Sequence, residues 1–171
     1  MKYLIWLLAI FLLLVFQVGV LLPLHLTPVN LILVFLVVTV VMSDFDSSLV
    51  IALIGGMMLD LISGTADGMI SLSMFTIFLI LYFILHALVN KEPSNLILFS
   101  SVAVTSIVYF FVFLAFNAIF LIFRLNQTLD YKYFLGSELI LTLFFNLLFT
   151  YPVFKYYSYV QSWVTRLKPK T

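Results

Sequence analysis

The stretch IALIGGMMLDLISGTADG, residues 51–68, decides how this chain folds. Its apolar first part contains one carboxylate, Asp60, and its second part is a turn rich in small and polar residues. Gly56, Asp60, Ser63, Gly64 and Asp67 recur every three or four residues, so they share one face of a helix. Because a charge inside a membrane must find donors or a proton, we expect this face to point into a helix bundle.

The composition identifies the solvent of this bundle. Hydrophobic residues make up 65% of the 171 positions, the mean hydropathy is +1.27, and only 8 basic and 7 acidic residues are present. These values predict an all-α integral membrane protein with a single domain, 1–171. The absence of cysteine excludes disulfides and thiolate metal sites, and His25 and His86 stand alone, so no metal site is expected. A net charge of +1 argues against nucleic acid as a partner.

Six apolar segments predict one bundle of six transmembrane helices. The second and third are short, about 24 and 27 Å at helical rise, and we expect them to form a hairpin. Thr27 and Pro28 suit the N-cap and first position of the second helix. A re-entrant hairpin, which would leave four spans, is the alternative. The predicted spans are 3–22, 28–43, 47–64, 69–89, 96–123 and 133–152.

Proline 152 is expected to bend or end the sixth span. Beyond it, in 153–168, apolar residues recur at helical spacing with basic residues between them. This pattern predicts an amphipathic extension that lies on the membrane surface.

Basic residues predict the orientation of the chain. With six spans both termini lie on one side, and the positive-inside rule then places them in the cytoplasm. On the terminal side fall Lys2, Lys91, Lys155, Arg166, Lys168 and Lys170, and on the other side Arg124 and Lys132.

Two interpretations of Asp60 follow from its position near the outer end of the third span. In the first, its carboxylate accepts hydrogen bonds from backbone amides of the turn from Ser63 to Gly68 and fixes that turn, with Gly64 ending the helix. In the second, it binds a ligand or carries a proton. We favour the first, because no histidine or arginine nearby in the sequence completes an acid-base site.

A second polar constellation lies on the predicted sixth span. Glu138, Thr142, Asn146 and Thr150 are spaced by four, which places them on one slowly rotating helical stripe. Such a stripe forms hydrogen bonds between helices or lines a cavity for a lipid headgroup or small solute, and Ser101 and Thr105 are candidates to face it. No enzyme motif is present, and neither an enzymatic activity nor a cofactor is expected.

Three elements together resemble the rod-shape-determining membrane protein family MreD: PVNLIL at 28–33, GMMLDLISG at 56–64, and Gly68 before the fourth span. This resemblance implies a non-enzymatic scaffold subunit of the bacterial cell-elongation complex, located in the inner (plasma) membrane. Such a subunit binds MreC through helix packing and helps link MreB filaments to peptidoglycan synthesis. It also leaves open a homodimer.

The same family is similar in fold to the substrate-binding subunits of energy-coupling-factor vitamin transporters, which gives the alternative function. Those subunits resemble one another in a face of small residues on the first helix, where the coupling subunit docks. Here Ala9 is followed four positions later by Leu13, with only Gly19 beyond. The missing face favours the scaffold.

Overall fold

The computed structural model describes residues 2–24, 29–42, 45–63, 68–88, 94–123 and 139–166, and the side chains of 86–88 are not included. Within these ranges every regular element is helical. The elements in chain order are α1 (Lys2–Phe16) with the π-helical turn η1 (Gln17–Leu21), α2 (Leu31–Met42), α3 (Phe45–Val50), the π-helical turn η2 (Ile51–Gly55), α4 (Gly56–Ser63), α5 (Met69–Leu88), α6 (Asn95–Ile122) and α8 (Leu139–Arg166).

Four helical segments are long and apolar enough to cross a membrane: Lys2–Leu21, Phe45–Ser63, Asn95–Ile122 and Leu139–Arg166. The apolar helices Leu31–Met42 and Met69–Leu85 are shorter. The prediction of an all-helical chain with membrane-type helices is therefore confirmed, and six crossings stay a prediction. The third segment begins at Phe45 rather than at residue 47.

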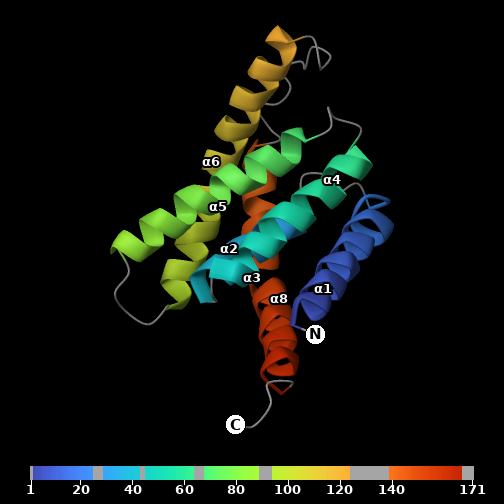
Figure 1. Cartoon of the computed structure of the whole chain (residues 1–171), viewed down its shortest axis with the longest axis vertical. Helices are drawn as coiled ribbons and strands as arrows, with labels where there is room; N and C mark the ends of the chain where they lie inside the picture. The colour runs from blue at the N-terminus through green and yellow to red at the C-terminus, as the bar shows by residue number, and fades with distance from the viewer. Residues whose placement is uncertain are drawn as a thin grey trace.

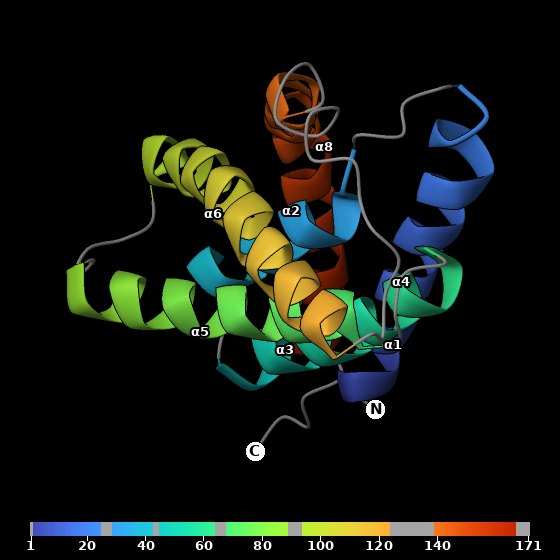
Figure 2. The same cartoon turned by 90° about the horizontal axis from the view of Figure 1, so that it is seen from above.

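Helix α2 forms the centre of the bundle. Every side chain from Leu31 to Val40 is buried, because α2 packs against α1, α5, α6 and α8 on its different sides. Figure 2 shows α2 enclosed by these helices. A helix that is apolar all round is expected in such a buried position. At 12 residues it is about 18 Å long, which is well below the roughly 30 Å of a hydrocarbon core.

The C-terminal part of the fold corrects one prediction. Helix α8 runs through Pro152 without interruption to Arg166, so the described part of the predicted extension, residues 153–166, continues the helix and is not a separate element. Its place relative to the membrane surface stays a prediction. Its apolar face is used inside the protein: the Tyr156 hydroxyl donates to the Ala9 carbonyl at 3.1 Å, and the Tyr157 hydroxyl donates to the Met42 carbonyl at 3.1 Å. Packing on α1 and α2 compensates for the one backbone hydrogen bond that proline removes.

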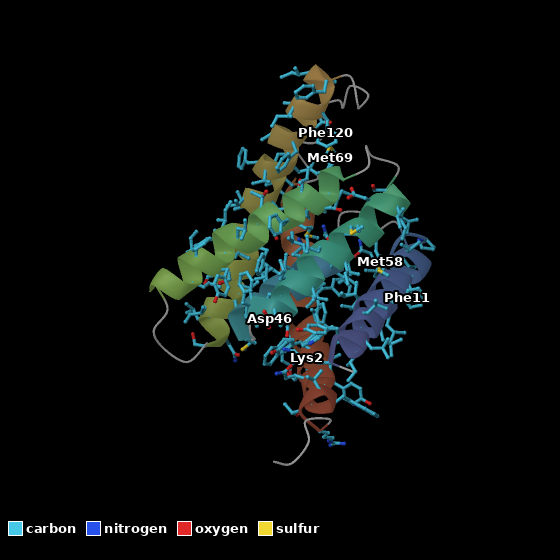
Figure 3. All side chains as sticks on the ribbon, in the orientation of Figure 1. Lys2, Phe11, Asp46, Met58, Met69 and Phe120 are labelled. Atoms are coloured by element: carbon cyan, nitrogen blue, oxygen red, sulfur yellow. The ribbon has the colours of Figure 1, made fainter. Side chains whose placement is uncertain are left out.

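Two features of the outline matter for the sites described below. Helix α1 begins and α8 ends at the same end of the molecule (Figure 1). At the opposite end, α6 extends past its neighbours, and Phe120 lies on this projecting part (Figure 3).

Candidate functional site

The Asp60 carboxylate holds the first turn of α5. It is only 7% exposed, its Oδ1 accepts from the Ile70 amide at 2.8 Å, and its Oδ2 accepts from the Ser71 amide at 2.9 Å. The Ser71 hydroxyl donates to the same Oδ2. The carboxylate of α4 therefore caps α5, the helix that follows the turn. Residues 64–67 of the turn from Ser63 to Gly68, whose amides we expected to be bound, lie outside the described residues, so that expectation stays a prediction.

The local backbone explains why α5 needs a cap from another helix. Gly68 precedes the helix with φ +90°, in a region that other residues rarely adopt, and its carbonyl accepts the first helical hydrogen bond, from Leu72, at 2.9 Å. Gly68 thus occupies the N-cap position but has no side chain to bind the free amides. Asp60 supplies the missing acceptors, and the positive end of the helix dipole stabilises its charge.

Gly56 brings the two helices close enough for this bond. A Cβ at Gly56 would lie 2.7 Å from the Ser71 Cα, so only glycine permits the backbones of α4 and α5 to approach as they do. Gly56 and Asp60 are four residues apart, so both act on the same residue of α5. The adjacent Gly55 faces the other way, because a Cβ there would lie 2.6 Å from the Ile32 side chain of α2.

Two further residues of the predicted motif have a smaller part. The Ser63 hydroxyl donates to the Asp60 carbonyl at 3.3 Å, within the last turn of α4. Gly64 lies outside the described residues, so its predicted role at the end of the helix stays a prediction.

The second constellation centres on Asn146. Its side chain is fully buried. Its Nδ2 donates to the Ser106 hydroxyl of α6 at 3.0 Å, and its Oδ1 accepts from the backbone amide of Asn30 at 3.0 Å. Asn146 therefore joins α8 to α6 and to the start of α2. The partner on α6 is Ser106, not the expected Ser101 or Thr105.

Its neighbours on the predicted stripe behave differently. The buried Thr150 donates back to the Asn146 carbonyl at 2.8 Å, and Thr142 is half-buried. Glu138 lies outside the described residues. Among the described residues of the stripe, Asn146 forms hydrogen bonds to other helices, whereas Thr150 forms one within α8.

Asn30 and Gln17 complete this network, and our reading of the sequence missed both. The Asn30 Oδ1 accepts from the Leu33 amide at 2.9 Å, which makes Asn30 the N-cap of α2 in place of Thr27. The Gln17 Oε1, in the π-helical turn η1, accepts from the Leu31 amide at 3.0 Å. An asparagine directly before an apolar run was the available signal for the cap.

These contacts limit the chemistry of the site. Both oxygens of Asp60 are engaged by α5, and the part of the chain that the structure describes contains no group of three potential metal ligands. No protein-family model, no curated protein and no solved structure matches this chain.

Proposed function

We propose that this protein is a non-enzymatic membrane scaffold of the bacterial cell-elongation complex, as the MreD-like residues imply. In this proposal six segments cross the inner membrane and both termini are cytoplasmic. The protein binds MreC by helix packing and, through it, helps link MreB filaments to peptidoglycan synthesis. The basic C-terminal residues hold anionic lipid nearby.

The observation that carries this proposal is the complete use of Asp60 as a cap for α5. An embedded carboxylate is the residue most suited to transport or catalysis in this chain. Here its oxygens accept hydrogen bonds from two backbone amides and one hydroxyl, which is a structural role. A protein whose buried polar groups serve its own fold acts best through its outer surface.

The outer surface of α1 favours the scaffold over the vitamin-binding alternative. Ala9 is 3% exposed, and its carbonyl accepts from Tyr156, so this small residue faces inward. The outward face carries large side chains, among them Leu4, Leu8 and Phe11. Such a face lacks the small residues on which the coupling subunit of a vitamin transporter docks.

Purification of the tagged chain from its native membrane in mild detergent, followed by mass spectrometry, tests this function. We expect MreC in near-stoichiometric amount, and the same yield of MreC with Gly19→Ala, a variant with nothing within 4 Å of the added Cβ. Recovery of a stoichiometric vitamin without a protein partner would refute the scaffold and establish the alternative.

A further inference from the structure

The outward face of α8 changes character along its length. Near the start of the helix the exposed side chains are aliphatic or phenylalanine, such as Leu141 and Phe144. From Tyr151 onward the exposed residues include Tyr151, Lys155, Tyr159 and Trp163, each four residues after the last. The Lys155 Nζ lies 4.8 Å from the centre of the Tyr151 ring, and the rings of Tyr159 and Trp163 meet edge to face at 6.0 Å. We call these four residues the Tyr-Lys face.

In the proposed topology, contacts with α1 give the depth of this face in the membrane. The segment Lys2–Leu21 has 20 residues, about 30 Å, which matches one hydrocarbon core. Ala9 therefore lies about 10 Å along it from Lys2. Since Tyr156 donates to the Ala9 carbonyl, the neighbouring Lys155 lies at a similar depth.

The direction of the Lys155 side chain keeps its charge at this depth. Tyr151, on which the ammonium rests, is one turn closer to the start of α8, and therefore further from the end where Lys2 lies. The side chain thus points toward the centre of the membrane and not toward the nearer membrane surface. Lys155 makes no ion pair in the described ranges, and a cation–π contact offsets only part of the cost of a cation in hydrocarbon.

An aromatic belt at the membrane interface explains only part of the Tyr-Lys face. From Tyr151 to Trp163 the face is about 18 Å long, whereas the headgroup zone on one side of a bilayer is about 6 Å thick. At the same level of the bundle, α1 exposes Leu4 and Leu8. Trp163 lies eight residues, about 12 Å, beyond Lys155 and thus near the level of Lys2, where α1 exposes Tyr3. Tyr159 and Trp163 therefore fit an aromatic belt, whereas Tyr151 and Lys155 lie deeper.

We propose that the Tyr-Lys face packs against a single transmembrane helix of a partner protein that carries an Asp or Glu opposite Lys155. Charge complementarity at this depth selects such an occupant, because lipid phosphates lie outside the hydrocarbon core. The described residues of a second copy of this chain offer no carboxylate to Lys155. Asp60 is buried, and Asp46 lies in the first turn of α3. This inference rests on the membrane topology of the proposed function, and it adds the face and the chemistry of the partner.

Photocrosslinking in native membranes tests the face. Tyr159→p-benzoylphenylalanine places the probe on the Tyr-Lys face, and Phe11→p-benzoylphenylalanine is the matched control, since Phe11 is an exposed aromatic on the outer side of α1 (Figure 3). We expect a protein adduct from position 159 that is absent from position 11. Mass spectrometry of the adduct should identify a single-span protein with an Asp or Glu within its span.

Charge variants then test the role of Lys155. Lys155→Leu should reduce the adduct about tenfold, equivalent to about 1.4 kcal/mol, and Lys155→Arg should keep it. Lys155→Glu should lose the adduct, and replacement of the partner's carboxylate by lysine should restore it. Unchanged thermal unfolding of the Leu variant would show that the fold is intact.

Each other outcome overturns the inference. These outcomes are an adduct of lipid mass only, an equal adduct from position 11, a partner without an embedded acid, or an adduct that Lys155→Leu leaves undiminished. Co-purification of MreC is a separate readout. If MreC co-purifies but no adduct forms at position 159, this inference fails while the proposed scaffold stands.

Discussion

Replacement of the Asp60 carboxylate should separate the start of α5 from α4. Asp60→Leu keeps the branched shape of the side chain and removes the acceptors of the buried Ile70 amide and the partly buried Ser71 amide. Asp60→Asn keeps one carbonyl oxygen and presents an NH₂ group where the second acceptor was. We therefore expect stability to decrease in the order wild type, Asn, Leu.

The contacts give the size of the effect. A buried amide left without a partner costs about 1–3 kcal/mol, so two give about 2–6 kcal/mol for Asp60→Leu. Loss of an ordinary exposed N-cap costs about 1 kcal/mol, because water replaces the cap. Asp60 is 7% exposed, so water replaces little here, and we expect about 3 kcal/mol for Leu and about 1–2 kcal/mol for Asn.

Thermal unfolding in one detergent, followed by the fluorescence of Trp6 and Trp163, measures this loss. For a chain of this length, 3 kcal/mol corresponds to a fall in Tm of about 6–12 °C. Asp46→Asn is the control, because Asp46 is an exposed carboxylate in the first turn of α3, and its Tm should stay within about 2 °C of wild type. Equal Tm values for Asp60→Leu and the wild type would refute the capping role.

Two other predictions concern the helix contacts. Gly56→Ala should lower Tm at least as much as Asp60→Asn does, because its Cβ would meet the Ser71 backbone. Gly19→Ala should have little effect on Tm. Thermal unfolding of both variants in the same detergent checks this, and equal Tm values would contradict it. Asn146→Leu should cost about 1–3 kcal/mol, since it removes bonds to α6 and α2, against under 0.5 kcal/mol for the exposed Ser158→Ala; a double-mutant cycle with Ser106→Ala should show coupling, and strict additivity would contradict the network.

The helices and the outline of the Asp60 face followed from local pattern in the sequence. Apolar runs predicted the first, third and fifth spans to within two residues of the helical segments observed, whereas α8 ends fourteen residues beyond the predicted sixth span. The spacing of Gly56 and Asp60 placed both on one face. The identity of the bound amides did not follow, because they belong to α5 and depend on how closely α4 and α5 approach. That approach depends on the glycine and on the π-helical turn before it, for which the residues 51–55 give no distinctive signal.

Tertiary packing also explains two features of α8 that the local sequence pattern did not give. Pro152 has a local preference to end a helix, but the tyrosines after it find hydrogen-bond partners on α1 and α2, so the helix continues. The spacing of the polar stripe correctly placed Asn146 inside the bundle. It gave no information on the rotation of α6, which turns Ser106 rather than Ser101 toward the amide.

The two polar constellations solve the same physical problem. Helix α2 is about 18 Å long and α5 begins at a glycine, and the first amides of both helices lie at buried or partly buried positions. Inside a membrane such amides must be satisfied by the protein itself. Asp60 does this for α5, and Gln17, Asn30 and Asn146 do it for α2 and the residue before it. An embedded charge is usually a sign of transport or catalysis, but here it follows from building a bundle with helices that start inside it. Lys155 of α8 caps no helix in the described residues, and for this reason we look for the function of this protein on its outer face.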